Sequence, residues 1–123
     1  NTFLDSPRLL NHQFCLKQNP RIVFAGQMTG VEGYIESAAS GLMAAFHLTR
    51  RLLGKAEITF PRDTMLGALS HYISDETVVD FQPMGSNMGI WPPLDERVRD
   101  KQQRYLLLAQ RAMESMKQAL KDE

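Results

Sequence analysis

The chain has 123 residues, 43% of them hydrophobic, and its 14 basic side chains balance 14 acidic ones. A chain of this length can bury enough surface for one domain with its own core. The net charge of zero excludes a nucleic-acid footprint spread over the whole surface and leaves only local basic patches. The single cysteine excludes an internal disulfide and a cysteine zinc site, and we expect no bound metal.

Membrane and targeting signals are absent from the sequence. No apolar run approaches the roughly 18 residues that a membrane span needs, and no signal-peptide pattern is present. We therefore expect a cytoplasmic protein with no membrane partner. Because the first residue is Asn1 rather than Met, we also expect the chain to be a piece of a longer protein.

The first half of the chain predicts one strand followed by one long helix. Residues 1–20 combine turn formers with short apolar pairs and predict an irregular segment with one helical turn near residues 8–12. Residues 21–25 are branched and aromatic and end at Gly26, which predicts a buried strand. Apolar residues then recur at helical spacing until Gly54, where the helix should end. The stripe expected to face the core consists of Val31, Ile35, Ala38, Leu42, Phe46, Thr49 and Leu53.

The second half predicts helices separated by extended backbone. Residues 57–60 are a candidate short strand, and residues 61–73 begin and continue a second helix. Residues 80–94 are rich in Pro, Gly and Asn and predict non-helical backbone. Asp95 and Glu96 are expected to cap a final helix. Its apolar stripe would consist of Val98, Tyr105, Leu108, Ala109, Ala112, Met116 and Leu120. The predicted fold class is α+β and mostly helical.

The segment between the first strand and the long helix carries the clearest chemical signal. It contains Gly26, Gly30 and Gly33, and glycines at such a turn let a flat ligand approach the backbone closely. The unpaired amides of the following helix favour an anion or an electron-rich carbonyl. The alternative is that the glycines only satisfy turn geometry. The spacing is not the G-x-G-x-x-G of a dinucleotide phosphate loop.

Four blocks of the sequence resemble consecutive blocks of one enzyme family. Residues 24–41 (FAGQMTGVEGYIESAASG) resemble the C-terminal flavin-contacting motif of the folate- and FAD-dependent tRNA uracil-5 methyltransferases, the TrmFO (formerly Gid) family. Residues 1–10 (NTFLDSPRLL), 61–73 (PRDTMLGALSHYI) and 81–94 (FQPMGSNMGIWPPL) resemble further blocks of that family in the same order. A sister family that modifies the tRNA wobble uridine has a related glycine turn but lacks the blocks after residue 60.

The resemblance implies the C-terminal part of a two-domain, glutathione-reductase-like FAD-binding α/β flavoprotein. Residues 1–54 would complete a split FAD-binding domain, and residues 55–123 would form a mostly helical extension. In such enzymes NAD(P)H reduces FAD, methylenetetrahydrofolate supplies one carbon, and C5 of a T-loop uridine in tRNA is methylated. The residues that would lie at the isoalloxazine ring are Gly26, Gln27, Gly30, Val31, Glu32, Gly33 and Tyr34.

The sequence also departs from the family pattern. The amino-terminal G-x-G-x-x-G turn and the upstream catalytic cysteines are absent, so the chain alone should be inactive and contains no predicted catalytic residue. Cys15 is expected to be an inert, partly buried thiol. The implied partners are tRNA, the missing N-terminal portion of the same protein and a second copy of the chain covering an exposed apolar face. The alternatives are the sister family and a cofactor-free helical binding module.

Other residues admit both a structural and a functional interpretation. The histidines, His12, His47 and His71, look too scattered for a metal site, and His47 is expected at the surface or edge. His71 is expected to be structural, with a tRNA or folate role as the alternative. Glu32 and Glu36 could cap the long helix or bind near the flavin. The final helix region is expected to be a solvated face, with phosphate contact as the alternative. The basic residues concerned are Arg97, Arg99, Lys101, Arg104 and Arg111. Trp91 is expected to pin the extended segment to the core, and base stacking by Trp91 and Tyr105 is the alternative.

Overall fold

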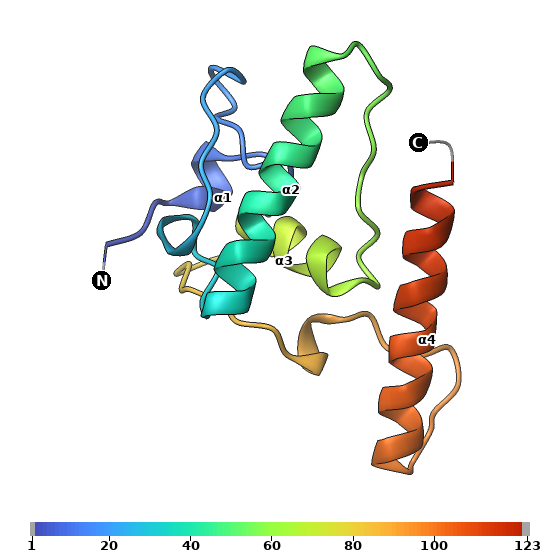
Figure 1. The fold of residues 1–123 in the computed structure, drawn as a ribbon. Helices are drawn as coiled ribbons and strands as arrows, with labels where there is room; N and C mark the ends of the chain where they lie inside the picture. The colour runs from blue at the N-terminus through green and yellow to red at the C-terminus, as the bar shows by residue number, and fades with distance from the viewer. Residues whose placement is uncertain (1, 122–123) are drawn as a thin grey trace.

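The computed structural model describes residues 2–121 and is mostly helical (Figure 1). Four α-helices and two short 3-10 helices follow one another along the chain. They are α1 (Ser6–Leu9), η1 (Gln27–Thr29), α2 (Tyr34–Leu52), α3 (Met65–Ser74), η2 (Met88–Ile90) and α4 (Lys101–Ala119). No helix within the described residues is long and apolar enough to cross a membrane. The mostly helical fold class is thus confirmed.

The two predicted strands are wrong for the described residues. Residues 21–25 form only one isolated antiparallel bridge, between Val23 and Cys15. Phe14 has a φ of 66° and turns the chain away, so the pairing does not continue into a ladder. Residues 57–60 are extended and unpaired. Both segments have the side chains of a strand, but a strand also needs a partner, which local sequence does not reveal.

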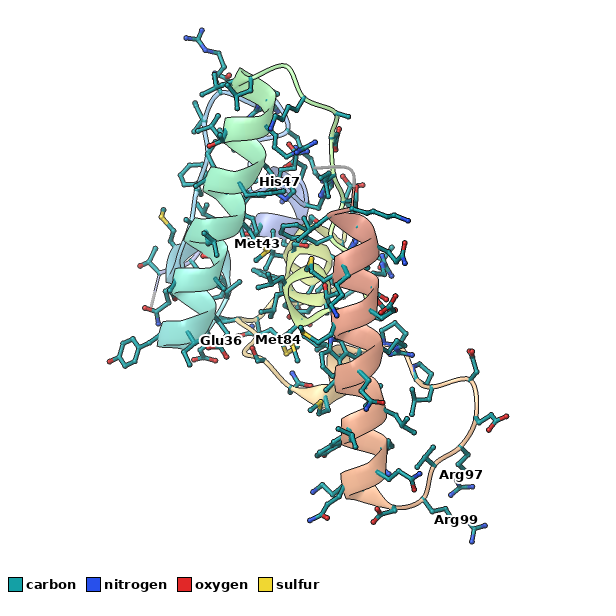
Figure 2. The ribbon with its side chains drawn as sticks, turned by 45° about the vertical axis from the view of Figure 1, so that its right-hand side comes forward. Glu36, Met43, His47, Met84, Arg97 and Arg99 are labelled. Atoms are coloured by element: carbon teal, nitrogen blue, oxygen red, sulfur yellow. The ribbon has the colours of Figure 1, made fainter. Side chains whose placement is uncertain are left out.

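The long helix α2 buries a different face from the predicted one. Its buried residues are Ser40, Met43, Ala44, His47 and Arg50. Figure 2 shows Met43 and His47 pointing from α2 towards α3. The predicted stripe is instead largely exposed, including Ile35 (82%), Leu42 (70%) and Leu53 (65%). Because α2 is apolar on two sides, periodicity alone identifies the helix but not the side that meets this core.

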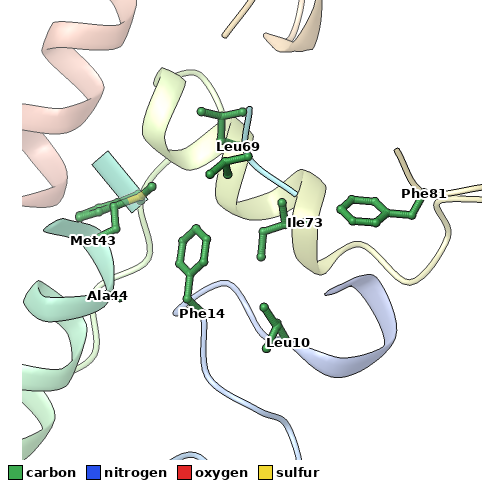
Figure 3. Close-up of a cluster of buried hydrophobic side chains, with 9 residues drawn as sticks. Leu10, Phe14, Met43, Ala44, Leu69, Ile73 and Phe81 are labelled. Atoms are coloured by element: carbon green, nitrogen blue, oxygen red, sulfur yellow. The ribbon is translucent and has the colours of Figure 1, made fainter. Parts of the chain in front are cut away.

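The core lies where α1, α2 and α3 meet (Figure 3). Leu10 and Phe14 follow α1 and pack with the buried face of α2 and the apolar face of α3. The buried cluster consists of Leu10, Phe14, Val31, Met43, Ala44, Phe60, Leu69, Ile73 and Phe81. α3 begins where predicted, and the Thr64 hydroxyl caps it by accepting the Gly67 N–H at 3.0 Å.

Helix α4 begins later than predicted. Asp100, rather than Asp95 or Glu96, is the N-cap, and its carboxylate accepts the Gln103 N–H at 3.1 Å. Residues 91–100 form a loop beside α4, so Val98 of the predicted stripe lies outside the helix. Leu108 is the one buried residue of α4. The only helical turn in the predicted extended segment 80–94 is η2.

Candidate functional site

Three glycines in left-handed conformations shape the loop that leads into α2. The φ angles are 85° at Gly26, 100° at Gly30 and 110° at Gly33, values that L side chains rarely adopt. Gly26 and Gly30 flank η1, and Gly33 is the N-cap of α2. The sequence therefore requires glycine at these positions for backbone geometry, whether or not a ligand binds.

The inner side of this loop packs against residues 81–84. Val31 is fully buried and forms a parallel bridge with Met84. Met84 N–H donates to the Gly30 carbonyl at 2.8 Å, and Glu32 N–H donates to the Met84 carbonyl at 3.0 Å. A Cβ at Gly30 would lie 2.3 Å from the Phe81 ring. Gly30 and Val31 thus serve the packing of this chain, while the loop's outer side remains open.

The outer side of the loop forms a shallow hollow of about 280 Å³. Gln27, Gly33 and Tyr34 line it, together with Ser37 one turn further along α2. The Tyr34 side chain is 98% exposed. Of the seven predicted site residues, these three meet at one hollow. Ser37 was absent from the predicted set, and its place one helical turn after Gly33 is the signal that could have indicated it.

The first turn of α2 carries uncapped backbone donors. Gly33 has no side chain to cap the helix, so the N–H groups of Tyr34 and Ile35 have no intrahelical acceptor. Glu36 instead accepts the Ser86 N–H at 2.9 Å. This bond, followed by one from its own backbone, lowers the pKa of the Glu36 carboxyl. Glu36 therefore has a structural role, and Glu32 is exposed.

Serine hydroxyls tie the glycine loop to the rest of the fold. The Gly26 N–H donates to the Ser40 hydroxyl at 2.7 Å, and that hydroxyl donates to the Ser37 carbonyl. The Ser6 hydroxyl donates to the Thr29 carbonyl at 2.6 Å. Ser6, Thr29 and Ser40 are fully buried. The loop is thus held to α2 on one side and to α1 on the other, which fixes the hollow before any ligand arrives.

The three histidines lie together, contrary to the prediction that they are scattered. The His12 ring is 5.9 Å from the His47 ring and stacks at 6.2 Å on the His71 ring. His47 is 4% exposed, which corrects its predicted surface position. Burial, followed by repulsion from His12, lowers its pKa to about 4. Within residues 2–121 no group of His, Cys, Asp or Glu is arranged to hold a metal ion.

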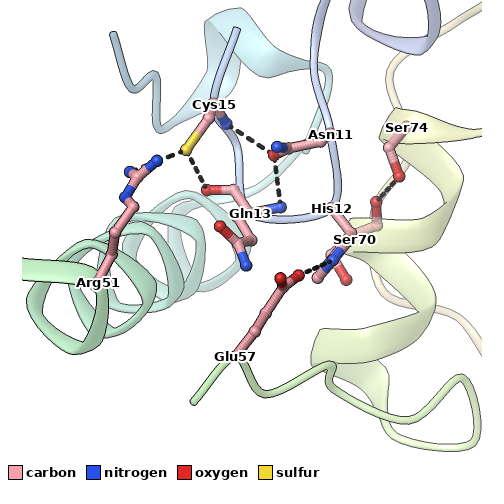
Figure 4. A network of polar contacts seen from close by, with 8 residues as sticks. All are labelled: Asn11, His12, Gln13, Cys15, Arg51, Glu57, Ser70 and Ser74. Atoms are coloured by element: carbon pink, nitrogen blue, oxygen red, sulfur yellow. Dashed lines mark hydrogen bonds and ion pairs between the residues drawn. The ribbon is translucent and has the colours of Figure 1, made fainter. Parts of the chain in front are cut away.

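Cys15 lies beside the histidine cluster and is more buried than predicted, with 1% of its surface exposed (Figure 4). Its thiol contacts the Gln13 carbonyl at 3.7 Å, and Arg51 donates to the sulfur at 3.4 Å. His12 is paired with Glu57 at 3.2 Å in the same region. A thiol enclosed in this way is a structural group, since solvent and substrates do not reach it.

Comparison with known proteins finds one family model and relatives that are named as tRNA methyltransferases. The family model described as Glucose inhibited division protein A matches residues 1–56. The methylenetetrahydrofolate–tRNA-(uracil-5-)-methyltransferase TrmFO of Pelotomaculum thermopropionicum is 52% identical over 116 residues, which are 94% of this chain and 26% of that protein. The TrmFO of Staphylococcus aureus strain JH9 is 51% identical over 118 residues, 95% of this chain and 27% of that protein.

These matches confirm the predicted resemblance to the TrmFO family. The identity extends over nearly the whole chain rather than over the glycine loop alone. The chain spans about a quarter of the length of the relatives it matches. The activity, cofactors and partners of those relatives therefore belong to proteins that are much longer than these 123 residues.

Proposed function

We propose that this chain is the C-terminal part of a flavoenzyme that methylates C5 of a T-loop uridine in tRNA, with methylenetetrahydrofolate and NAD(P)H as co-substrates. The observation that carries the proposal is the 51–52% identity to TrmFO proteins over 94–95% of the chain. Residues 1–54 would complete the FAD-binding domain of a two-domain protein, and residues 55–123 would extend it. A cytoplasmic location accords with a tRNA substrate. The chain alone would be inactive.

The hollow beside the glycine loop suits the carbonyl edge of a flat ring. Gly33 presents bare backbone there, and the amides of Tyr34 and Ile35 point their partial positive charge out of the helix. Bound FAD supplies hydride and one-electron chemistry in enzymes of this type. The first-turn amides of α2 would stabilise negative charge on the reduced ring, while Tyr34 and Gln27 would border it.

The two alternatives are the sister wobble-uridine family and a cofactor-free binding module, and the comparisons disfavour the first. The family model matches residues 1–56 only. These residues include the glycine turn, which resembles that of the sister wobble-uridine family. The identity to TrmFO proteins continues through residues beyond 60, which favours the uracil-5 methyltransferase. The cofactor-free binding module is tested directly by flavin uptake.

A chimeric enzyme tests the proposal. The segment of the S. aureus TrmFO that this chain matches is replaced by this chain, and flavin absorbance and methyl transfer to tRNA are measured. We expect flavin to copurify and tRNA to be methylated. Gly33→Leu should abolish flavin uptake, because its Cβ would meet the Glu36 carboxylate at 2.3 Å and its bulk would block close approach of the ring to the first turn of α2. Gly54→Leu also places a side chain at a positive φ, at the other end of α2 and away from the hollow, and should retain flavin. A colourless chimera contradicts the proposal, and undiminished uptake in Gly33→Leu removes Gly33 from the site.

The exposed stripe of α2 supports docking of the missing portion of the protein. Large side chains on it are Ile35, Leu42 and Leu52, with exposed fractions of 82%, 70% and 78%. Small residues lie between them, at Ala38 and Ala45, so that the positions follow the alternating three- and four-residue spacing of a helix seam. We infer that the remaining three quarters of the protein cover this face. An uncovered seam of this kind favours association with another copy.

The isolated chain should consequently self-associate through α2. We expect light scattering after gel filtration to give an apparent mass that rises with concentration above 14.0 kDa. Leu42→Glu should restore the monomer at a stability cost within about 0.5 kcal/mol, because the position is exposed. Val79→Glu changes another exposed apolar residue away from α2 and should leave association intact. A wild-type chain that stays monomeric throughout would contradict the inference.

A further inference from the structure

A second hollow lies away from the glycine loop, between the loop 91–98 and α4. Its volume is about 700 Å³, ample for a nucleotide. Aromatic and cationic side chains line it together, notably Trp91, Arg97, Arg104 and Tyr105. These residues come from the loop 91–98 and from α4, and the sequence alone predicts no definite ligand for either segment. In the structure they line the same hollow.

The walls of this hollow are fixed by backbone contacts from α4. Arg111 donates to the carbonyls of Pro92 and Pro93, the latter at 3.1 Å. Arg104 donates to the Val98 carbonyl at 3.2 Å. The loop is therefore tied to the helix near both of its ends, and the hollow exists without a ligand. A preformed site loses less conformational entropy on binding than one that must be ordered.

The rings and charges suit an unstacked base with its phosphate. The Arg104 guanidinium and the Lys101 ammonium each lie 5.5 Å from the centre of the Tyr105 ring. The Trp91 indole N–H is buried and has no acceptor among the described residues, so Trp91 offers its ring rather than this N–H to the hollow. Aromatic faces beside arginine planes are the usual means by which proteins hold bases of single-stranded RNA.

The basic side chains near the hollow favour contact with a polyanion at the loop before α4 rather than along the whole helix. Figure 2 places Arg97 and Arg99 on the loop at the start of α4. Asp95 and Glu96 also lie in this loop, and both line the hollow, so the acidic groups there equal in number the two basic ones, Arg97 and Arg104. Asp100 is engaged as the helix cap. The balance favours one or two phosphate contacts and leaves most of the binding to the rings.

We propose that the hollow between Trp91 and Tyr105 binds an unstacked base of single-stranded RNA, with Arg97 and Arg104 at the adjoining phosphate. The inference rests on the proposed function for its RNA, since the relatives' name specifies tRNA as their substrate. It adds a second contact surface, remote from the glycine loop, that would hold a loop nucleotide of the substrate.

The intrinsic fluorescence of the chain reports on this hollow, because Trp91 is its one tryptophan. The chain is titrated with an RNA hairpin that has the sequence of a tRNA T-arm, and separately with a fully paired RNA duplex of equal length. We expect the hairpin to change Trp91 fluorescence saturably and the duplex to bind at least about tenfold more weakly. An unchanged Trp91 signal while labelled hairpin binds, or equal binding of the duplex, overturns the inference.

Matched variants separate stacking from folding. Tyr105→Ala should weaken hairpin binding by roughly five- to hundredfold, the loss that alanine substitution causes at stacked bases. Tyr105→Phe keeps the ring and should bind like the wild type. Leu106→Ala, at an exposed neighbour on α4 outside the hollow, should also leave binding unchanged. Circular dichroism verifies that each variant folds, and wild-type affinity in folded Tyr105→Ala overturns the inference.

The chimera distinguishes this inference from the proposed function. If the unmodified chimera methylates tRNA and Tyr105→Ala leaves its KM for tRNA unchanged, the base site is wrong and the function stands. If the chimera binds no flavin while the chain still binds the hairpin through Trp91, the proposed function fails and the RNA site stands.

Discussion

Gly67→Ala should lower the free energy of unfolding by about 3 kcal/mol, through overpacking and the loss of a helix cap. A Cβ at this position in α3 would lie 1.8 Å from the Pro61 carbonyl oxygen and 2.6 Å from that of Phe60. These are backbone atoms, so no side-chain rotation can relieve the contact. The Pro61 carbonyl also accepts the N–H and hydroxyl of Thr64, whose oxygen caps the Gly67 N–H. The added methyl group would therefore disrupt the start of α3.

Urea denaturation followed by circular dichroism measures this effect. The matched control is Gly41→Ala in the middle of α2, where nothing lies within 4 Å of the new Cβ. Gly41→Ala should stabilise the chain by up to about 1 kcal/mol, because alanine loses less backbone entropy than glycine in a helix. Similar unfolding midpoints for the two variants would show that residues 60–67 do not pack as described.

The helices were predictable because their signals are local. The glycine turn, the end of α2 near Gly54 and the Thr64 cap all follow from short-range backbone chemistry. The strands were wrong because pairing depends on distant segments. Residues 21–25 satisfy the composition of a strand and still find only a single bridge to Cys15. The predicted cap Asp95 and the observed cap Asp100 have the same side chain, so composition alone does not distinguish them. The path of the loop 91–100 determines which of the two caps α4.

In the predicted site, too, the features set by local sequence were predictable and those set by distant contacts were not. That Gly26, Gly30 and Gly33 shape a turn could be inferred from the sequence, and all three have positive φ angles. The pairing of Val31 with Met84 could not be inferred in the same way, because residues 81–84 are distant in sequence. The histidine cluster was missed for this reason too, since each ring comes from a different part of the chain. Tertiary contacts thus decide which residues of a local motif remain open to a ligand.

The pH dependence of stability should be dominated by His47, whose pKa falls from its ordinary 6.5 to about 4 in the folded chain. Burial is the main cause, and repulsion from His12, Arg50 and Arg51 outweighs attraction to Glu57. Phe46 and Phe60 pack beside the ring, and its Nε2 has no hydrogen-bond partner within residues 2–121. The folded state therefore keeps the ring neutral at pH values where the unfolded state protonates it.

Between pH 6.5 and 4 the unfolded state binds the additional proton, so the free energy of unfolding rises with pH across this range. The stabilisation is complete above the unfolded pKa and is lost as the pH falls towards 4. Between pH 7 and pH 5 the loss from His47 should be about 2 kcal/mol. Because the pKa of His71 is also lowered, mainly by burial, it adds a smaller loss of the same sign.

His47→Gln removes the titrating group, and urea titrations at a series of pH values between 7 and 5 then measure the change. The variant should retain only the weaker slope from His71. An equal slope in wild type and variant would show that His47 is already accessible to protons in the folded state. NMR titration of the three imidazole resonances supplies the independent measurement, because a His47 pKa near 6.5 would contradict the burial of its ring beside Phe46 and Phe60.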